Sequence, residues 1–374
     1  MNERTTDRKR EDGRRRLPLF AWIFFGFSAL AGILYVLFLC STRFSDWFNR
    51  TVAAALRAFL AYLTSWIPFS FAEYLILLLP ILLFLLALLG IRKYSDSWRD
   101  VGIFCLCLLS VGALIFSLFT VGFAPAYRGT KLEQKLGIDA VEIDAEALYD
   151  TAQILVARLE EEADAIRYGE DGFSVMPYDC NGMNERLIEA YGSVCDRYSF
   201  VQRLSSRVKP VMMSQAMSYT HITGVYTFFT GEANINVAFP DYTLPYTAAH
   251  ELSHQRGIAR EDEANFMAFL VCASSSDAYI RYSGYLNLTE YVLVALRQAS
   301  PTLYAKVYRT LPSLVRGELA AYSDFFEEYR DSVAGEISGA VNDTVLTIHG
   351  TEGTKSYGLV VDLAVAYFAD AEYN

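Results

Sequence analysis

The sequence predicts an N-terminal region of three transmembrane helices followed by a mainly α-helical, α+β domain with a small sheet. Hydrophobic residues make up 53% of the 374 residues, and most of the apolar excess precedes residue 125. Beyond that point helical periodicity dominates, interrupted by one short aromatic and β-branched stretch. We therefore divide the chain into residues 1–124, a basic tail with three spans, and residues 125–374, a globular domain.

Three apolar segments are each long enough to cross a lipid bilayer. Residues 18–40 and 101–124 contain no charged side chain, and residues 71–91 contain only Glu73, near the start. A helix needs about 20 apolar residues to span the hydrocarbon core. The first segment is too long for the core of a signal peptide and no small-residue cleavage site follows it, so we expect it to be retained. The sequence predicts a multi-pass membrane protein.

Basic residues indicate the orientation of these spans. The first 17 residues contain seven Lys and Arg, and the joint at residues 92–99 contains three. Because positive segments remain in the cytoplasm, the loop 41–70 and everything after the third span should lie outside it. Three arginines in that loop make the bias moderate. Its aromatic stretch, residues 47–66, fits either an interfacial amphipathic helix or ordinary loop packing.

Charge also divides the chain in two. Residues 1–124 contain 13 Lys and Arg against 8 Asp and Glu, whereas the remainder contains 19 against 35. An acidic domain argues against nucleic acid as a partner. Cys180 and Cys195 are both in this domain, and spacing alone leaves open whether they pair. The oligomeric state is equally open.

The globular domain begins with a linker, expected at residues 125–143. Helical periodicity then predicts helices over residues 145–168 and 184–198. Two short stretches, residues 224–229 and 234–239, are rich in aromatic and β-branched side chains and are separated by a turn. They predict a hairpin or two adjacent strands.

The chemistry-bearing motif follows the second of these strands. His250 and His254 are four residues apart, so a helix places both imidazoles on one face, close enough to hold one metal ion. Glu251 lies one step around that helix, where it can accept a proton from a water bound to the ion. Pro245 suits the first turn of such a helix, and Gly257 suits the position just past its end.

A catalytic zinc ion needs a third protein ligand and one open position. Six residues after His254, where a three-histidine site would continue, the chain has Arg260, which cannot bind zinc. A carboxylate must therefore serve. Glu261 and Glu263 are two apart, about 200° around a helix, so only one of them should face the metal. Helix geometry alone leaves both open.

The run from His250 to His254, followed by Glu261-x-x-Ala264-Asn265, resembles the gluzincin arrangement of zinc peptidases. This resemblance implies Glu261 as the third ligand and Asn265 as the partner that supports a ligand histidine. The separation between His254 and Glu261 is shorter than in most gluzincins, which keeps Glu263 as the alternative. Other divalent ions can occupy such a set of ligands, but Zn²⁺ is the expected cofactor.

A wider resemblance covers nearly the whole chain. It rests on the three spans and on Phe-Thr-Gly-Glu-Ala-Asn-Ile-Asn at 229–236, His-Glu-Leu-Ser-His-Gln-Arg-Gly at 250–257, Glu-Asp-Glu-Ala-Asn-Phe at 261–266 and Arg-Tyr-Ser-Gly-Tyr at 281–285. Together these are similar to a bacterial family, domain of unknown function 3810. The resemblance implies a zincin-like metallopeptidase domain on the outer side of a bacterial cytoplasmic membrane, with no implied substrate.

Further side chains are candidates for substrate contacts. Peptide hydrolysis needs a donor for the tetrahedral oxyanion, and Tyr282, Tyr285 and His221 are the candidates. Glu232 and Asn234 are candidates for substrate binding. Either predicted strand could pair with an extended substrate or lie inside the sheet.

These observations predict a membrane-anchored zinc peptidase that acts on a peptide or protein substrate. Zinc-activated water attacks the peptide bond, and Glu251 is the general base. Endopeptidase and exopeptidase activity remain alternatives. The alternative from another class is a zinc-binding scaffold or receptor in the envelope that cleaves nothing, against which the intact Glu251 argues.

Overall fold

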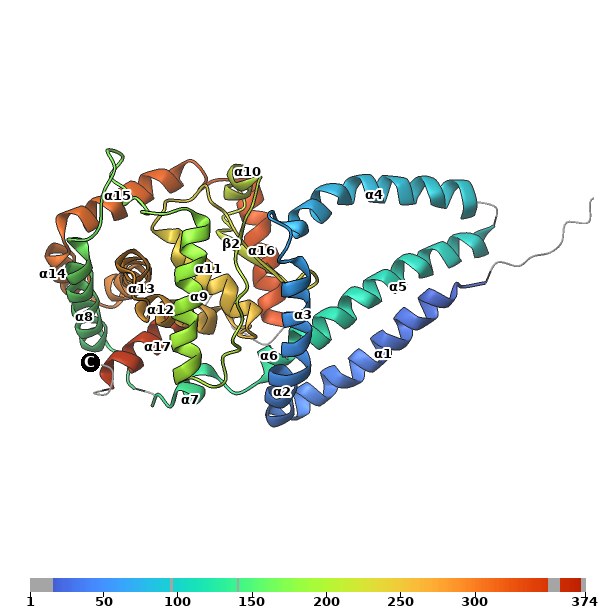
Figure 1. The fold of residues 1–374 in the computed structure, drawn as a ribbon, viewed down its shortest axis with the longest axis horizontal. Helices are drawn as coiled ribbons and strands as arrows, with labels where there is room; N and C mark the ends of the chain where they lie inside the picture. The colour runs from blue at the N-terminus through green and yellow to red at the C-terminus, as the bar shows by residue number, and fades with distance from the viewer. Residues whose placement is uncertain (1–15, 95–96, 140, 349–356, 371–374) are drawn as a thin grey trace, which may run out of the picture.

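The computed structural model describes residues 16–94, 97–139, 141–348 and 357–370, so most of the basic N-terminal tail lies outside the described residues. Three long helices project from one side of a globular region (Figure 1). They are α1 (Leu19–Cys40), α4 (Phe71–Tyr94) and α5 (Trp98–Gly122), and each is long and apolar enough to cross a membrane. The three predicted apolar helices are thus present.

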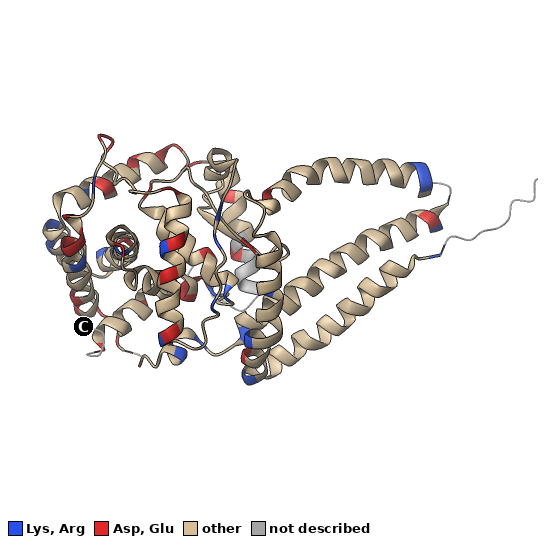
Figure 2. Ribbon diagram, in the orientation of Figure 1, with Lys and Arg blue, Asp and Glu red and all other residues tan. Residues whose placement is uncertain are grey.

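The projecting helices are arranged unequally. Helices α1 and α5 lie side by side, whereas α4 diverges from them along most of its length (Figure 1). Arg92 and Lys93 form the last turn of α4, and the adjoining joint leads into α5. Figure 2 shows that this basic end of α4 lies away from the globular region, as does the N-terminal start of α1. The start of α1 and the basic last turn of α4 therefore lie at the same end of the projecting helices.

A buried polar network joins the projecting helices to the globular region. It is centred on the consecutive helices α2 (Thr42–Phe48), η1 (Asn49–Ala53, a π-helix) and α3 (Ala54–Thr64). The Nη1 of Arg57 donates to the Asn49 Oδ1 and to the Gly122 carbonyl, both at 2.8 Å. Asn49 Nδ2 in turn donates to the Gly257 carbonyl at 2.9 Å. Burial lowers the pKa of Arg57 to about 10. This network ties the end of α5 to the motif region.

The globular region is mainly helical, as predicted. Its helices are α6 (Ala124–Arg128), α7 (Leu132–Leu136), α8 (Ala145–Ala163), α9 (Cys180–Arg197), α10 (Ser214–Ser218), α11 (Thr243–Gln255), α12 (Glu261–Ala273), α13 (Ala278–Ala299), α14 (Pro301–Thr310), α15 (Ser313–Glu327), α16 (Val333–Ile348) and α17 (Tyr357–Ala369). Helices α11 and α12 are buried along nearly their whole length and form the centre of the core.

One expectation about this region is corrected, and one question that the sequence left open is answered. Residues 125–143 are not simply a linker, because α6 and α7 bury Tyr127 and Leu132 against the rest of the domain. Cys180 and Cys195 are both free thiols in α9. Fifteen residues of one helix separate them by about 22 Å, which is too far for a disulfide.

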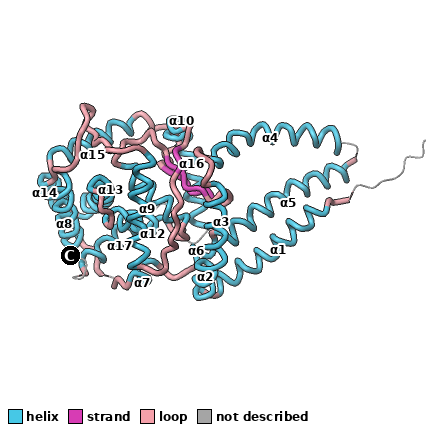
Figure 3. Tube along the Cα trace, in the orientation of Figure 1, coloured by secondary structure: helices cyan, strands magenta, loops and turns pink. Residues whose placement is uncertain are grey.

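The sheet has three short strands, β1 (Lys209–Pro210), β2 (Gly224–Thr227) and β3 (Glu232–Ile235). Their order is β1-β3-β2, with β2 and β3 antiparallel and β1 and β3 parallel. Figure 3 shows the strands in magenta within the otherwise helical globular region. Two adjacent antiparallel strands are present as predicted, although the second spans 232–235 instead of 234–239. Strand β1 is an addition that the sequence analysis missed. Because β3 is central, β1 and β2 are the edge strands, and each has one edge that pairs with no other described strand.

Candidate functional site

The turn after α11 is built by its last residues and Gly257. Gly257 has φ +88°, the left-handed conformation that glycine adopts without a Cβ penalty. The Gly257 N–H donates to the His254 carbonyl at 3.0 Å, and the Ile258 N–H donates to the Ser253 carbonyl at 3.1 Å. This pair of bonds ends the helix and reverses the chain. The reversal brings the start of α12 back beside the two histidines.

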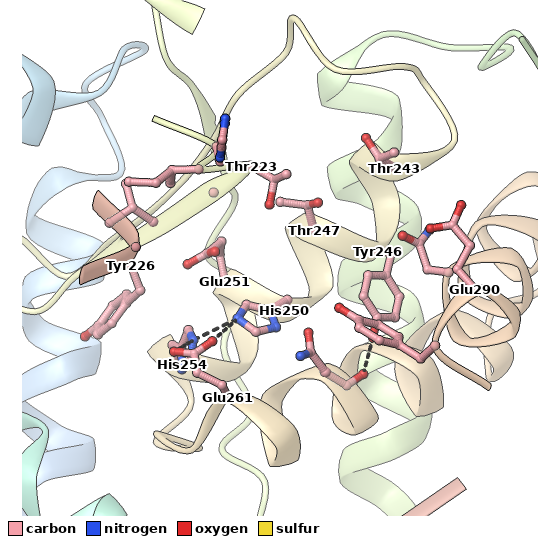
Figure 4. A pocket seen from close by; sticks show the side chains of 18 of the residues that line it. Thr223, Tyr226, Thr243, Tyr246, Thr247, His250, Glu251, His254, Glu261 and Glu290 are labelled. Atoms are coloured by element: carbon pink, nitrogen blue, oxygen red, sulfur yellow. Dashed lines mark hydrogen bonds and ion pairs between the residues drawn. The ribbon is translucent and has the colours of Figure 1, made fainter. Parts of the chain in front are cut away.

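Three metal-ligating side chains meet at this point. His250 Nε2 and His254 Nε2 are 2.9 Å apart, and Glu261 oxygens lie 3.2 Å from the first and 3.6 Å from the second (Figure 4). Each of the three residues offers one ligand atom within 4.8 Å of the others. Tetrahedral zinc with bonds of about 2.0–2.2 Å separates its ligand atoms by about 3.3–3.6 Å. The donor set therefore fits zinc within a few tenths of an ångström.

Glu263, the alternative ligand, lies elsewhere. Its Oε1 accepts a hydrogen bond from the Leu132 backbone N–H at 3.0 Å, and Arg260 Nη1 is 3.4 Å away. Burial raises the pKa of Glu263 to about 7. The two glutamates point to different sides of α12, and of the two only Glu261 lies with the histidines.

The histidines are held unequally. His254 Nδ1 lies 2.8 Å from the Ile258 carbonyl, a contact in which the ring donates and leaves Nε2 facing the cluster. His250 Nδ1 and Asn265 Nδ2 are both buried without a hydrogen-bond partner. The expected bond from Asn265 to a ligand histidine is thus absent among the described residues, and the Ile258 carbonyl takes that orienting role for His254.

Charge couples His254 to Glu261. Burial opposes protonation of His254, but the Glu261 carboxylate outweighs it and raises the pKa of His254 to about 9. Burial would raise the pKa of Glu261, but His254 and His250 outweigh it and hold that pKa far below its usual range. The carboxylate is therefore ionised at any physiological pH, as a metal ligand must be.

Glu251 lies beside this cluster and is 5% exposed. Burial raises its pKa, opposed by the two histidines and by a hydrogen bond from the Tyr226 backbone. Strand β2 passes directly over it: a Cβ placed on Gly224 would be 2.6 Å from Glu251 Oε1. Figure 4 shows the Glu251 side chain between β2 and His250. Such a carboxylate can exchange a proton with a molecule bound at the cluster.

A cavity of about 1190 Å³ opens on these groups. One wall is α11, whose Thr243, Thr247, His250 and His254 recur at helical spacing and all line the cavity. A second wall is β2 with the segment before it, and residues of α6, α12, α13, α15, α16 and α17 line the remainder together with Phe123. Strand β2 therefore borders the same space as the cluster.

The predicted oxyanion donors are not at the cluster. Tyr282 is fully buried and hydrogen-bonds Tyr168 and Glu318, and Tyr285 packs on the core; neither lines the cavity. Packing thus accounts for both tyrosines. His221 does line the cavity, with its Nε2 2.6 Å from the Tyr329 carbonyl.

The two residues predicted to bind substrate, Glu232 and Asn234, lie outside the cavity. Glu232 is 2% exposed, and its carboxylate accepts a hydrogen bond from Lys209 Nζ at 2.6 Å and from the Ala72 N–H at 2.8 Å. It anchors the start of α4, where the N-terminal dipole favours a negative charge. The Asn234 amide donates to the Val225 carbonyl at 3.2 Å within the sheet. Neither residue lines the cavity.

Tyr127 is a cavity residue that the sequence analysis missed. Burial and the nearby Glu261 carboxylate both raise its pKa. It packs with Phe123, whose ring centroid is 5.5 Å from that of Tyr127 and 6.0 Å from that of His254. The cluster therefore lies beside the C-terminal end of α5. No motif marks Tyr127, since it is more than 100 residues from the histidines.

Comparisons with known proteins place the chain in a family. The family model described as protein of unknown function DUF3810 matches residues 48–365, which include every residue of the cluster. A search of curated proteins and a search of solved structures each find no match. The match covers most of the sequence, and it confirms the family resemblance seen in the motifs. The chain therefore belongs to the DUF3810 family of proteins of unknown function.

Proposed function

We propose that this protein is a membrane-anchored, zinc-dependent peptidase of the zincin type. The observation that carries the proposal is the convergence of His250, His254 and Glu261 on one point with the buried Glu251 beside it. A zinc ion held there acts as a Lewis acid toward water and toward a carbonyl oxygen. The cavity around this point is large enough for several residues of a peptide.

Glu251 is the general base of the proposed reaction. Its raised pKa makes the carboxylate a better proton acceptor than an exposed glutamate. It takes the proton from the attacking water and passes it to the nitrogen of the departing amine. The crowding by Gly224 and Thr247 restricts the carboxylate to a narrow range of positions, which favours this transfer.

Strand β2 supplies the expected substrate binding. One edge of β2 pairs with β3, the other pairs with no described strand, and Gly224, Val225 and Tyr226 of β2 line the cavity. An extended peptide can add to such an edge through main-chain hydrogen bonds, with little dependence on sequence. Of the two strands considered from the sequence, β2 is the one available for this role, because β3 is paired on both sides.

The basic last turn of α4 supports a location for the reaction. It lies at the end of that helix remote from the globular region. We propose that this end is cytoplasmic and that the globular region works on the outer side of the membrane, close to its surface. A reporter fused after residue 374 tests the topology, since an outer reporter is reached by reagents that do not cross the membrane.

The experiment for the activity uses the full chain in detergent, with zinc content and peptide hydrolysis measured together. Glu251→Gln should retain about one zinc per chain, as expected of one three-ligand site, and lose hydrolysis by at least about 100-fold. Glu160→Gln, the same change at an exposed position of α8, is the matched control. Equal hydrolysis by wild type and Glu251→Gln would overturn the mechanism. Bound zinc with no Glu251-dependent hydrolysis would favour the scaffold alternative.

A further inference from the structure

The cavity has a second charged end, away from the metal-ligating cluster. Glu290 of α13 lines it, together with Tyr322 of α15 and the polar side chain of Asn287. Figure 4 shows Glu290 beyond Tyr246, on the opposite side of His250 from Tyr226. A substrate that passes the cluster can therefore extend to this carboxylate.

Glu290 has no cationic partner among the described residues. It is half-buried, and its Oε1 accepts a hydrogen bond from the hydroxyl of Tyr242 at 2.8 Å. No Lys or Arg is among the described residues that line the cavity, whereas Glu251, Glu261 and Glu290 all do. A desolvated carboxylate without a counterion is unfavourable, and a bound cation relieves that penalty.

The position of Tyr242, which hydrogen-bonds Glu290, relates Glu290 to the reacting point. Its partner Tyr242 immediately precedes α11, eight residues before His250. A helical rise of about 1.5 Å per residue places the backbone of Tyr242 about 12 Å from that of His250 along the helix axis. An extended peptide advances about 3.3 Å per residue, so the separation corresponds to about three residues of substrate.

The direction of β2 sets which part of the substrate reaches Glu290. Gly224, at the start of β2, lies against Thr247 and Glu251, whereas the ring of Tyr226 packs on Phe123, which contacts His254. Strand β2 thus runs away from the Glu290 end. Antiparallel pairs outnumber parallel ones. A peptide paired antiparallel with β2 therefore directs its C-terminal part toward Glu290.

We propose that Glu290 is a specificity-determining residue that binds a Lys or Arg side chain about three residues C-terminal to the scissile bond. The position in the substrate is counted from the scissile bond, so this part of the inference rests on the proposed peptidase function. The binding itself does not require cleavage, because the Glu290 carboxylate, held by Tyr242, can bind a cationic side chain of any peptide in the cavity.

The first arm of the test measures binding. The full chain with Glu251→Gln, in detergent and loaded with zinc, is titrated with fluorescent peptides in which one Lys is moved along a neutral sequence, and with norleucine counterparts. Lys at the favoured position should bind about 10-fold tighter than norleucine, as expected of a partly desolvated charge pair. Adding Glu290→Gln should reduce that ratio to about 1, whereas adding Glu160→Gln should leave it unchanged.

The second arm measures cleavage. A peptide library digested by the wild type should show Lys or Arg enriched about three residues after the cut, and Glu290→Gln should remove the enrichment. Glu290→Asp, which retains the charge, should preserve part of the enrichment. This variant also controls for loss of the enrichment through unfolding. Enrichment before the cut, or dependence on a free N-terminal amine, overturns the inference.

The two arms separate the inference from the proposed function. Lys-dependent binding that requires Glu290, with no cleavage by any variant, overturns the peptidase and supports the cation site. Cleavage that requires Glu251, with equal Lys and norleucine affinities, overturns the cation site and supports the peptidase.

Discussion

Gly224 of β2 and Glu251 of α11 are in direct contact. A Cβ on Gly224 would lie 2.6 Å from Glu251 Oε1 and 2.7 Å from its Cγ, and 2.8 Å from Thr247 Cγ2. Contacts this short are not tolerated, so the edge strand approaches the carboxylate as closely as it does only because residue 224 has no side chain. The relationship couples the proposed substrate-binding strand to the proposed base.

The first prediction concerns this contact. Gly224→Ala should push β2 and the Glu251 carboxylate apart and lower kcat/KM by about 100-fold, since a displacement of about 1 Å is enough for such a loss. Zinc content should be unchanged, because the ligands are on the other side of Glu251. Peptide hydrolysis and metal analysis of the purified full chain check both parts.

Gly339 supplies the matched control for this substitution. It lines the same cavity, and a Cβ added to it would meet nothing within 4 Å. Gly339→Ala should therefore keep its hydrolysis near that of the wild type. Equal kcat/KM for Gly224→Ala and Gly339→Ala would show that the approach of β2 to Glu251 has no role in the reaction.

The second prediction separates the two glutamates of α12. Glu261→Ala should lose zinc while retaining its thermal stability in the metal-free form, because Glu261 faces the cavity. Glu263→Ala should retain zinc but lose about 1–3 kcal/mol of stability, because the Leu132 N–H loses its buried acceptor. Metal content and thermal unfolding in detergent measure the contrast. Zinc loss in Glu263→Ala alone would transfer the ligand role to that residue.

The third prediction concerns pH. Burial raises the pKa of Glu290 to about 7, partly offset by the Tyr242 hydrogen bond and reinforced by Glu318. The carboxyl is therefore largely neutral at pH 6 and largely ionised at pH 8, and only the ionised form attracts a cation. The preference for Lys over norleucine should grow as pH rises between these values. A constant preference, measured by peptide titration of Glu251→Gln, would contradict this assignment.

The fourth prediction concerns the network that joins the two regions. Arg57→Met should lower the free energy of unfolding by about 2–4 kcal/mol, because the Gly122 carbonyl and the Asn49 side chain lose buried hydrogen bonds. Thermal unfolding in detergent measures the loss. Arg43→Met, the same change at an exposed position of α2, should have little effect. Similar unfolding temperatures for both variants would show that Arg57 is not a structural anchor.

Several features followed directly from local sequence. The three apolar helices follow from length and composition, because a long stretch with almost no charged side chains is unfavourable in water and long enough to cross a bilayer as a helix. The helix from Thr243 to Gln255 is bounded by residues with local conformational demands, above all Gly257 at φ +88°. The juxtaposition of His250 and His254 is a property of helical spacing alone.

Other predicted site residues lie away from the cavity, because packing against distant segments decides their positions. Glu232 is in a turn-like, polar stretch, yet Lys209 and the start of α4 bury it. Tyr282 and Tyr285 have the right chemistry for oxyanion donors but face the core around Glu318 and α8. Their fate depends on partners far away in the chain, which no local pattern reveals.

The sequence by itself determined the three apolar helices, because they follow from composition. It also determined the histidine pair on one helical face and Glu251 beside it, because these follow from residue spacing on a helix. Only the tertiary structure decided that Glu261 rather than Glu263 joins the pair, that β2 rather than β3 is the free edge, and that Glu290 and Tyr127 share their cavity. These are relations between segments dozens of residues apart. They arise from how buried surfaces pack against one another. Side-chain periodicity describes one helix or strand and contains no information about which distant segment packs against it.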